Sequence, residues 1–229
     1  INNIPELNNH LETKKTMLTE ARRIAKTQPH EAIKIWKKLD AQKHSQASVD
    51  YALYLYSNKQ KNRALAILNP YVNPKSTPRE ISLCLAWIHA QENDFDALKL
   101  CLTQLLESGD AEAIFILATK AYELKYYPEA LQYSQSFILA KGNLEQAIII
   151  KAKSALKIYE SLPNTENKTL LEKTQAQLEE LQMNKSPSML CTLSEMNYSL
   201  QNHESSLAYA RQANYQVLIK KNLARLLIK

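Results

Sequence analysis

The chain has 229 residues, of which 45% are hydrophobic and only two are glycine, and it carries a formal net charge of +6. This length is enough for one or two globular domains or for a single stack of repeats. Because tight β-hairpins and phosphate-binding loops both depend on glycine, the composition argues against an all-β fold and against nucleotide-binding enzymes. No stretch approaches the roughly 18 apolar residues that would span a membrane as a helix.

The N-terminal residues 1–12 are rich in asparagine and interrupted by Pro5, a composition typical of a linker. The chain begins at Ile1 rather than at a methionine, so an upstream signal or membrane anchor stays open as an expectation. Over residues 1–43, nine basic residues stand against five acidic ones. Such an excess favours an anionic partner or a membrane surface, although a solvated helix face is the simpler explanation.

A short pattern recurs along the chain: an acidic or polar pair, a small residue and an apolar residue. The small residues of the first four copies lie 32, 33 and 33 positions apart, and the fifth follows after 76, which fits two units plus about eight residues. Each small residue opens an apolar stripe with helical spacing, and another such stripe precedes it. Each copy therefore predicts a pair of helices. The small residues are Ala32, Ala64, Ala97, Ala130 and Ser206.

This pattern resembles the tetratricopeptide repeat, whose period is about 34 residues. In the fourth copy, Leu117 and Ala118 stand where the family has its Leu-Gly pair, and Tyr127 and Ala130 match the start of the second helix. Small side chains on both helices let the two backbones approach closely. The repeats are degenerate, because glycine never occupies the Leu-Gly position. The resemblance implies an all-α fold, a right-handed α-solenoid of antiparallel helix pairs.

The predicted repeats extend over residues 13–213 as five to six helix pairs. The fifth pair, at about residues 143–184, is irregular, because a connector with Pro163 separates a long helix from an acidic-leaning helix that begins at Thr169. Ser186 and the proline after it predict the start of the last pair.

Residues 214–229 predict a basic capping helix. From residue 211 to the end there are five Lys or Arg residues and no acidic residue. The basic residues are expected on one side of this helix, and the apolar residues expected on the other are Val217, Leu218, Leu223, Leu226 and Leu227. A solenoid exposes its last apolar face unless such a helix covers it.

The candidate catalytic groups form none of the usual motifs. The five histidines make no H-x-x-x-H pair, no serine lies in a G-x-S-x-G motif, and no Cys/His arrangement is visible. We therefore expect no catalytic residue, no cofactor and no metal, and we do not expect an enzyme. Cys84 and Cys101 lie on the two helices of one predicted pair, where both two buried thiols and a disulfide stay open.

We expect a non-catalytic scaffold or adaptor for protein–protein interaction. The resemblance implies that the first helix of each pair lines a concave groove that binds a peptide or a partner protein. Arg22 and Lys26 resemble a basic clamp for a carboxylate, which favours an acidic partner. Each position can alternatively serve solvation or packing between helices. The groove residues implied in this way are Leu18, Arg22, Lys26, Leu53, Tyr56, Leu83, Trp87, Gln91, Phe115, Thr119 and Tyr122.

Other functions and partners stay open. Nucleic acid is disfavoured, because no polar residue recurs at one place in every unit, as a repeat that reads RNA bases requires. The resemblance also implies a bacterial, envelope-anchored assembly or secretion factor, serving a pilus, a secretion system or the outer membrane. A third hypothesis is the repeat appendage of an enzyme whose catalytic domain lies outside this chain. Both a cytoplasmic location and a periplasmic or membrane-anchored one are consistent with these hypotheses, as are contact of the basic C-terminal helix with a membrane surface and a homodimer.

Overall fold

A computed structural model describes residues 4–73, 76–141, 144–181 and 186–227, with the backbone alone at 4–11 and at 227. All regular elements of these residues are helical, thirteen α-helices and one short 3-10 helix, so the all-α expectation is confirmed. The helices divide into two compact units, Ile1–Ser108 and Gly109–Lys229. No helix in the described part of the chain combines the length and the hydropathy needed to cross a membrane.

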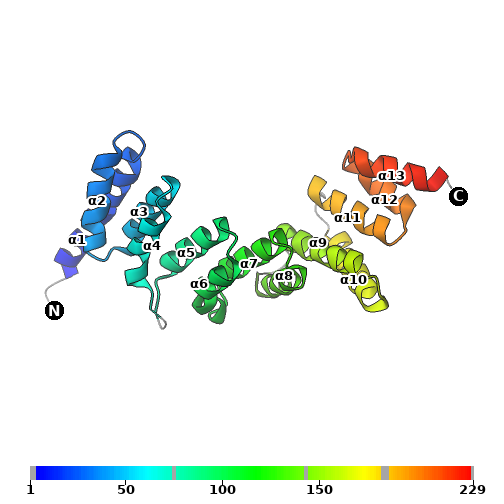
Figure 1. Cartoon of the computed structure of the whole chain (residues 1–229), viewed down its shortest axis with the longest axis horizontal. Helices are drawn as coiled ribbons and strands as arrows, with labels where there is room; N and C mark the ends of the chain where they lie inside the picture. Colours follow the sequence, from blue (N-terminus) through cyan, green and yellow to red (C-terminus); the bar gives the residue numbers. More distant parts are fainter. Residues whose placement is uncertain (1–3, 74–75, 142–143, 182–185, 228–229) are drawn as a thin grey trace. The chain divides into compact units, whose positions relative to one another are not determined.

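In the first unit, each helix packs against the next along the chain, and α3 also packs against α5 (Figure 1). The apolar face of each helix is buried in this way, and one continuous core runs through α1 to α5. The elements are α1 (Ile4–Ile24), α2 (Pro29–Ala41), α3 (Ser45–Ser57), α4 (Lys61–Leu68), the 3-10 helix η1 (Asn69–Tyr71), α5 (Arg79–Gln91) and α6 (Phe95–Glu107).

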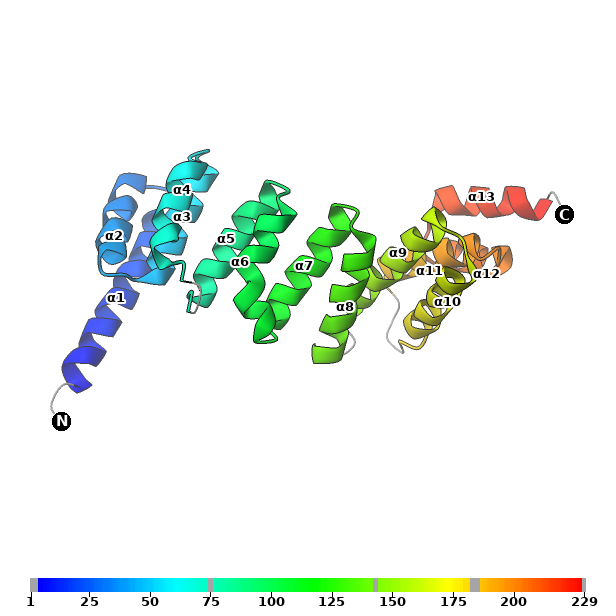
Figure 2. The same cartoon turned by 60° about the horizontal axis from the view of Figure 1, so that its bottom comes forward.

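In the second unit, consecutive helices also pack against each other, and α7 contacts α9, α9 contacts α11, and α11 contacts α13. Figure 2 shows the last of these helices, α13, beside α12 and α11. Contact with both the next helix and the next but one is compatible with a helical repeat. The elements are α7 (Ala111–Glu123), α8 (Tyr127–Lys141), α9 (Glu145–Ser161), α10 (Thr165–Glu179), α11 (Pro187–Ser199), α12 (His203–Gln212) and α13 (Gln216–Leu227).

The small residues that recur in the sequence are mostly buried in the structure. Four of the five small residues singled out in the sequence are fully buried, whereas Ala97 is only half-buried and the neighbouring Leu98 is fully buried in its place. A side chain larger than alanine or serine at such a site would push the two backbones apart. The four fully buried residues are Ala32, Ala64, Ala130 and Ser206.

Two serines form reciprocal hydrogen bonds between α11 and α12. The Ser194 hydroxyl donates to the Ser206 carbonyl oxygen at 2.6 Å, and the Ser206 hydroxyl donates to the Ser194 carbonyl oxygen at 2.7 Å. Asn222 of α13 donates its side-chain N–H to the Ser206 hydroxyl oxygen at 2.8 Å. All three side chains are fully buried, so polar groups rather than apolar ones join the last three helices here.

The C-terminal helix buries a different face from the one expected. Leu218 and Asn222 are buried, whereas Val217 and Leu223 are 57% and 39% exposed. Residues four apart share a helix face, and residues six apart lie about 240° around the axis from one another. The expectation that Val217, Leu218 and Leu223 share one side is therefore wrong.

Two segment boundaries also differ from expectation. Helix α1 begins at Ile4, so residues 4–12 are helical and not linker-like. Pro5 stands in the first helical turn, where a missing N–H removes no helical hydrogen bond. Helix α10 begins four residues before Thr169, because the Asn164 side chain accepts a hydrogen bond from the Asn167 N–H at 2.7 Å and caps the helix.

Six helices end in the same backbone turn, although none of them ends at a glycine. The residue after the cap has a positive φ, and the N–H of the next residue donates to the carbonyl oxygen five positions before it. This is the Schellman arrangement, for which glycine is the usual residue. Gly109 takes the same conformation after α6, at φ 72°. The six other residues are Lys43, Lys59, Asn93, Lys125, Gln201 and Asn214.

Candidate interaction surfaces

The groove residues expected in the first unit lie on α1, α3 and α5, apart from Lys26, which lies in the turn after α1, and they differ widely in exposure. Leu18 is 6% exposed and belongs to the core. Leu53 and Leu83 are half-buried, and Lys26 and Gln91 are exposed. Of these five residues, only Lys26 and Gln91 are therefore exposed to a partner.

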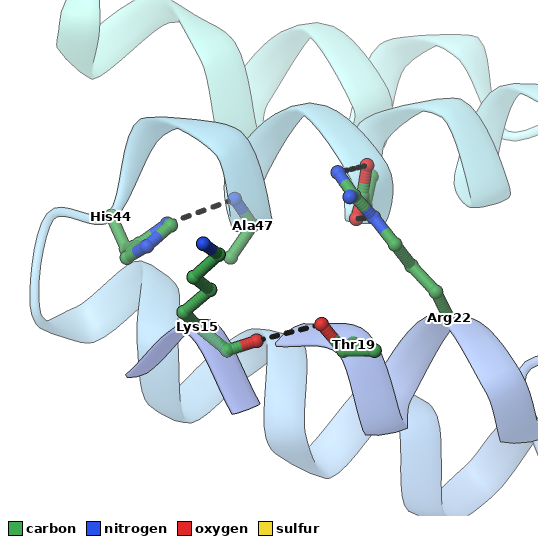
Figure 3. A network of polar contacts seen from close by, with 6 residues as sticks. Lys15, Thr19, Arg22, His44 and Ala47 are labelled. Carbon is green, nitrogen blue, oxygen red and sulfur yellow. Dashed lines mark hydrogen bonds and ion pairs between the residues drawn. The ribbon is translucent and has the colours of Figure 1, made fainter. Parts of the chain in front are cut away.

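Arg22 is bound within the chain. Its Nε donates to Asp50 Oδ2 at 2.5 Å and its second terminal N–H donates to Asp50 Oδ1 at 3.1 Å, which joins α1 to α3 (Figure 3). The hydrogen bond with Asp50 is the main cause that raises the pKa of the Arg22 guanidinium. Asp50 thus accepts the two Arg22 N–H groups, and neutralises the positive charge, that a partner carboxylate would need. Of the two expected clamp residues, only Lys26 has no partner within the described part of the chain.

An aromatic pair marks the surface of α3 and α5. Trp87 is 44% exposed, and the edge of one ring faces the other in its contact with Tyr56, with the ring centroids 5.2 Å apart and the planes at 74°. The Tyr56 hydroxyl donates to Glu92 Oε1 at 2.8 Å, and Lys61 Nζ donates to Glu92 Oε2 at 2.9 Å. Bonds from Lys61 and Tyr56 lower the pKa of the Glu92 carboxyl. We call Tyr56, Lys61, Trp87 and Glu92 the Trp87 patch.

Two of the expected groove residues in the second unit line a hollow. Phe115 and Thr119 of α7 face Ile149 and Ile150 of α9 across a space of about 500 Å³. Phe115 also packs on Phe137, with the ring centroids 5.2 Å apart. These aromatic side chains are thus turned partly into the unit, unlike Trp87.

The third expected residue of this unit, Tyr122, lies in a polar cluster. Burial raises the pKa of the Tyr122 hydroxyl, and the positive charge of Lys157 lowers it in part. Lys157 Nζ donates to Glu160 Oε2 at 2.7 Å, and the Tyr215 hydroxyl donates to Glu195 Oε1 at 3.1 Å.

Sequence reasoning missed the members of this cluster on α9 and α11. Their signal is periodic, since Lys157 follows Tyr122 by 35 positions and Glu195 follows Lys157 by 38. The irregular fifth pair hid this spacing, because it carries no small residue in the expected place. We call Tyr122, Lys157, Glu160, Glu195 and Tyr215 the Tyr122 cluster.

A further hollow of about 490 Å³ lies between α4, η1, α5 and α6 of the first unit, and no motif in the sequence indicated it. Its lining includes Leu65, Val72 and Leu100, together with His89 and Cys101. Burial is the main cause that raises the pKa of the Cys101 thiol to about 11. The thiol is therefore protonated at neutral pH and is a poor nucleophile, even though a histidine lines the same space.

The cysteines are free thiols. Cys84 is buried, and Cys101 and Cys191 are half-buried. Burial is also the main cause that raises the pKa of the Cys84 thiol to about 12. Of the two alternatives for Cys84 and Cys101, the structure has two separate thiols rather than a disulfide. Among the described residues, no group of three or more His, Cys, Asp and Glu side chains is arranged to hold a metal ion.

No protein-family model matches the chain, and a comparison with curated proteins finds no matching sequence. The fold and the surfaces described above are therefore the grounds for any function.

Proposed function

We propose that this chain is a non-catalytic scaffold that binds a peptide or a partner protein, and that the Trp87 patch is its main contact. Each unit would be a tetratricopeptide-like, right-handed stack of antiparallel helix pairs that presents its odd-numbered helices to the partner. The contacts of α3 with α5, of α7 with α9 and of α9 with α11 support this arrangement. Buried small residues on paired helices support it as well.

The observation that carries the proposal is the exposure of Trp87 beside Tyr56. Trp and Tyr are the residues most enriched among those that dominate binding energy, and a polar rim that excludes water surrounds them in typical interfaces. In the Trp87 patch, Lys61 and Glu92 supply such a rim and already satisfy each other. Covering the indole would bury apolar surface without leaving a charge unpaired.

The expected charge of the partner follows from which basic side chains are already paired within the chain. Because Asp50 neutralises Arg22, only Lys26 of the expected clamp is left to attract an acidic segment. We therefore propose a partner that docks mainly through an apolar side chain, with an acidic group nearby as a smaller contribution.

The test is binding by variants of the Trp87 patch. A partner captured with the intact chain would be purified, and its affinity compared for Trp87→Ala, Tyr56→Ala and the control Leu139→Ala, which removes a 78% exposed side chain from α8. We expect Trp87→Ala to weaken binding about 30-fold, near 2 kcal/mol, and Leu139→Ala to leave it unchanged.

Fluorescence gives an independent measurement. Trp36 is buried at 3% exposure, so Trp36→Phe would leave Trp87 as the sole indole reporter. Partner binding should then shift the Trp87 emission to shorter wavelength. Full affinity in Trp87→Ala together with an unmoved emission would overturn the proposal.

A further inference from the structure

A hollow of about 410 Å³ in the second unit lies between α8, α9 and α10, and no functional residue discussed so far lines it. The side chains around it are basic, amide, hydroxyl or apolar, and no acidic side chain is among them. Lys151 belongs to it, whereas Lys157 of the same helix belongs to the Tyr122 cluster. The two lysines are six residues apart, about 240° around the helix, so they serve different surfaces.

Lys151 is an ammonium group without a counter-charge. It is half-buried, and its Nζ donates to the neutral Gln177 side-chain oxygen at 2.7 Å. Burial lowers its pKa. Lys157, by contrast, donates to a carboxylate at the same distance. A charge that is partly withdrawn from water and has only an amide partner is unfavourable unless an anion joins it.

Other donors converge on the same space from two more helices. Lys173 and Gln177 lie one turn apart on α10, and Gln132 and Gln135 lie on one face of α8. In the described part of the chain, no ion pair joins Lys151 or Lys173 to a carboxylate. Amide N–H groups and two ammonium groups are the donors that oxygen atoms of an anion require.

We propose that this hollow binds an oxyanion, a carboxylate or a phosphate, carried by a small ligand with a short apolar group. Lys151 and Lys173 would hold the anionic oxygens, and the amides of Gln132 and Gln135 would fix their orientation. Leu131 and Leu170 line the same space and would contact the apolar group. The volume falls within the roughly 300–1,000 Å³ of small-ligand sites.

The experiment titrates the whole 229-residue chain with sodium phosphate and, separately, with sodium butyrate, each against sodium chloride at the same ionic strength. The readouts are calorimetry and the NMR signals of the lysine side-chain termini. We expect one of the two anions to bind saturably with a Kd of about 1 mM or below and to raise the pKa of Lys151. Binding of phosphate alone identifies a phosphate ligand, and binding of butyrate alone identifies a carboxylate with an apolar group.

Three variants separate the site from general charge attraction. Lys151→Met keeps the length of the side chain and should weaken binding at least tenfold, and Lys173→Gln, at an exposed position, should weaken it by a smaller factor. Lys157→Met removes the same charge from another face of α9 and should leave binding unchanged. An equal loss in Lys157→Met and Lys151→Met, or no saturable response to either anion up to about 50 mM, would overturn the proposal.

Discussion

In the first unit, several charged side chains are bound to one another across helices, and an aromatic side chain stays exposed among them. Arg22 holds Asp50, and Glu92 receives hydrogen bonds from both Tyr56 and Lys61. Trp87 remains exposed among these closed contacts.

On the corresponding helices of the second unit, the aromatic side chains are less exposed than Trp87. Phe115 packs on Phe137, and Tyr122 contacts Tyr127 with the ring centroids 5.8 Å apart, so the aromatic rings are half-withdrawn. Charged groups remain together at the surface, among them Lys157 and Glu195. Two units with one pattern of helix contacts thus present different chemistry, and the difference lies in side-chain pairing and not in the backbone.

The largest expected effect tests whether the units are separate in stability. Ser206→Leu would overfill the contact of α11 with α12. It would also remove the hydrogen bond from the Ser206 hydroxyl to the Ser194 carbonyl oxygen and the acceptor of one of the two Asn222 hydrogen bonds. We expect a loss of about 4 kcal/mol, from overpacking and from unsatisfied polar groups together. Urea unfolding followed by circular dichroism measures the loss over the whole chain.

Both tryptophans lie in the first unit, so their fluorescence reports that unit alone. The fluorescence transition of Ser206→Leu should move less than the transition seen by circular dichroism. The neighbouring Ser205→Leu, at an exposed position, is the matched control and should change neither transition. Equal shifts by both probes would show that the units unfold together.

A smaller effect is expected from the ion pair that joins α1 to α3. Asp50→Ala leaves Arg22 unpaired, and because the Arg22 side chain is 49% exposed, we expect a loss of only about 0.5–1 kcal/mol. A double-mutant cycle with Arg22→Met measures the coupling. The matched pair Lys157 and Glu160, three residues apart on α9, should couple more weakly. A larger coupling for Lys157 and Glu160 would contradict this order.

The helix-terminating turns should respond alike in both units. Lys59→Gly and Lys125→Gly each relieve a left-handed residue, at φ 61° and 68°. The strain removed, about 1–2 kcal/mol, exceeds the entropy that glycine adds to the unfolded chain, so each change should stabilise by about 0.5 kcal/mol. Thermal unfolding measures the gain.

The reverse change provides the control. Gly109 has φ 72°, and an added Cβ would meet no atom within 4 Å, so Gly109→Ala introduces backbone strain without a clash. We expect a loss of about 1 kcal/mol. Stabilisation by Gly109→Ala would show that the left-handed conformation carries no cost at these turns.

The smallest effect is a dependence on pH. The pKa of Glu92 is lowered in the folded chain from its ordinary value of 4.5, first by the hydrogen bond from Lys61 and then by that from Tyr56. Its contribution to stability is complete above that ordinary value and is lost as the pH falls through the folded pKa. Trp87 fluorescence during acid titration follows the loss. Glu92→Gln should remove this part of the titration, and an identical curve for the variant would contradict it.

Local patterns were sufficient for the helices and for several of their ends. Apolar spacing predicted the helices, and Ser186 accepts a hydrogen bond from the Met189 N–H and begins α11 as expected. Asparagine-rich composition misled at residues 4–12, because these residues begin a longer helix whose later part packs into the core of the first unit.

Side-chain pairs were beyond reach of the sequence. Arg22 and Asp50 are 28 residues apart, and their meeting depends on the register of α1 against α3. Lys151 meets Gln177 across 26 residues for the same reason. Arg22 of the expected clamp therefore proved to belong to an internal ion pair. Lys151, which no motif had singled out, proved to lack a counter-charge. Register is set by packing of whole helix faces, which no local motif records.

The turns that end with lysine, asparagine or glutamine have a consequence for how such a chain can change over evolutionary time. The backbone reverses at these turns through hydrogen bonds between main-chain atoms, although glycine, the usual residue, is absent from Lys43, Lys59, Asn93, Lys125, Gln201 and Asn214. Side-chain identity at these positions is then free to drift at a small energetic penalty. A fold of this kind can therefore be kept while the residues by which a sequence family is recognised are substituted.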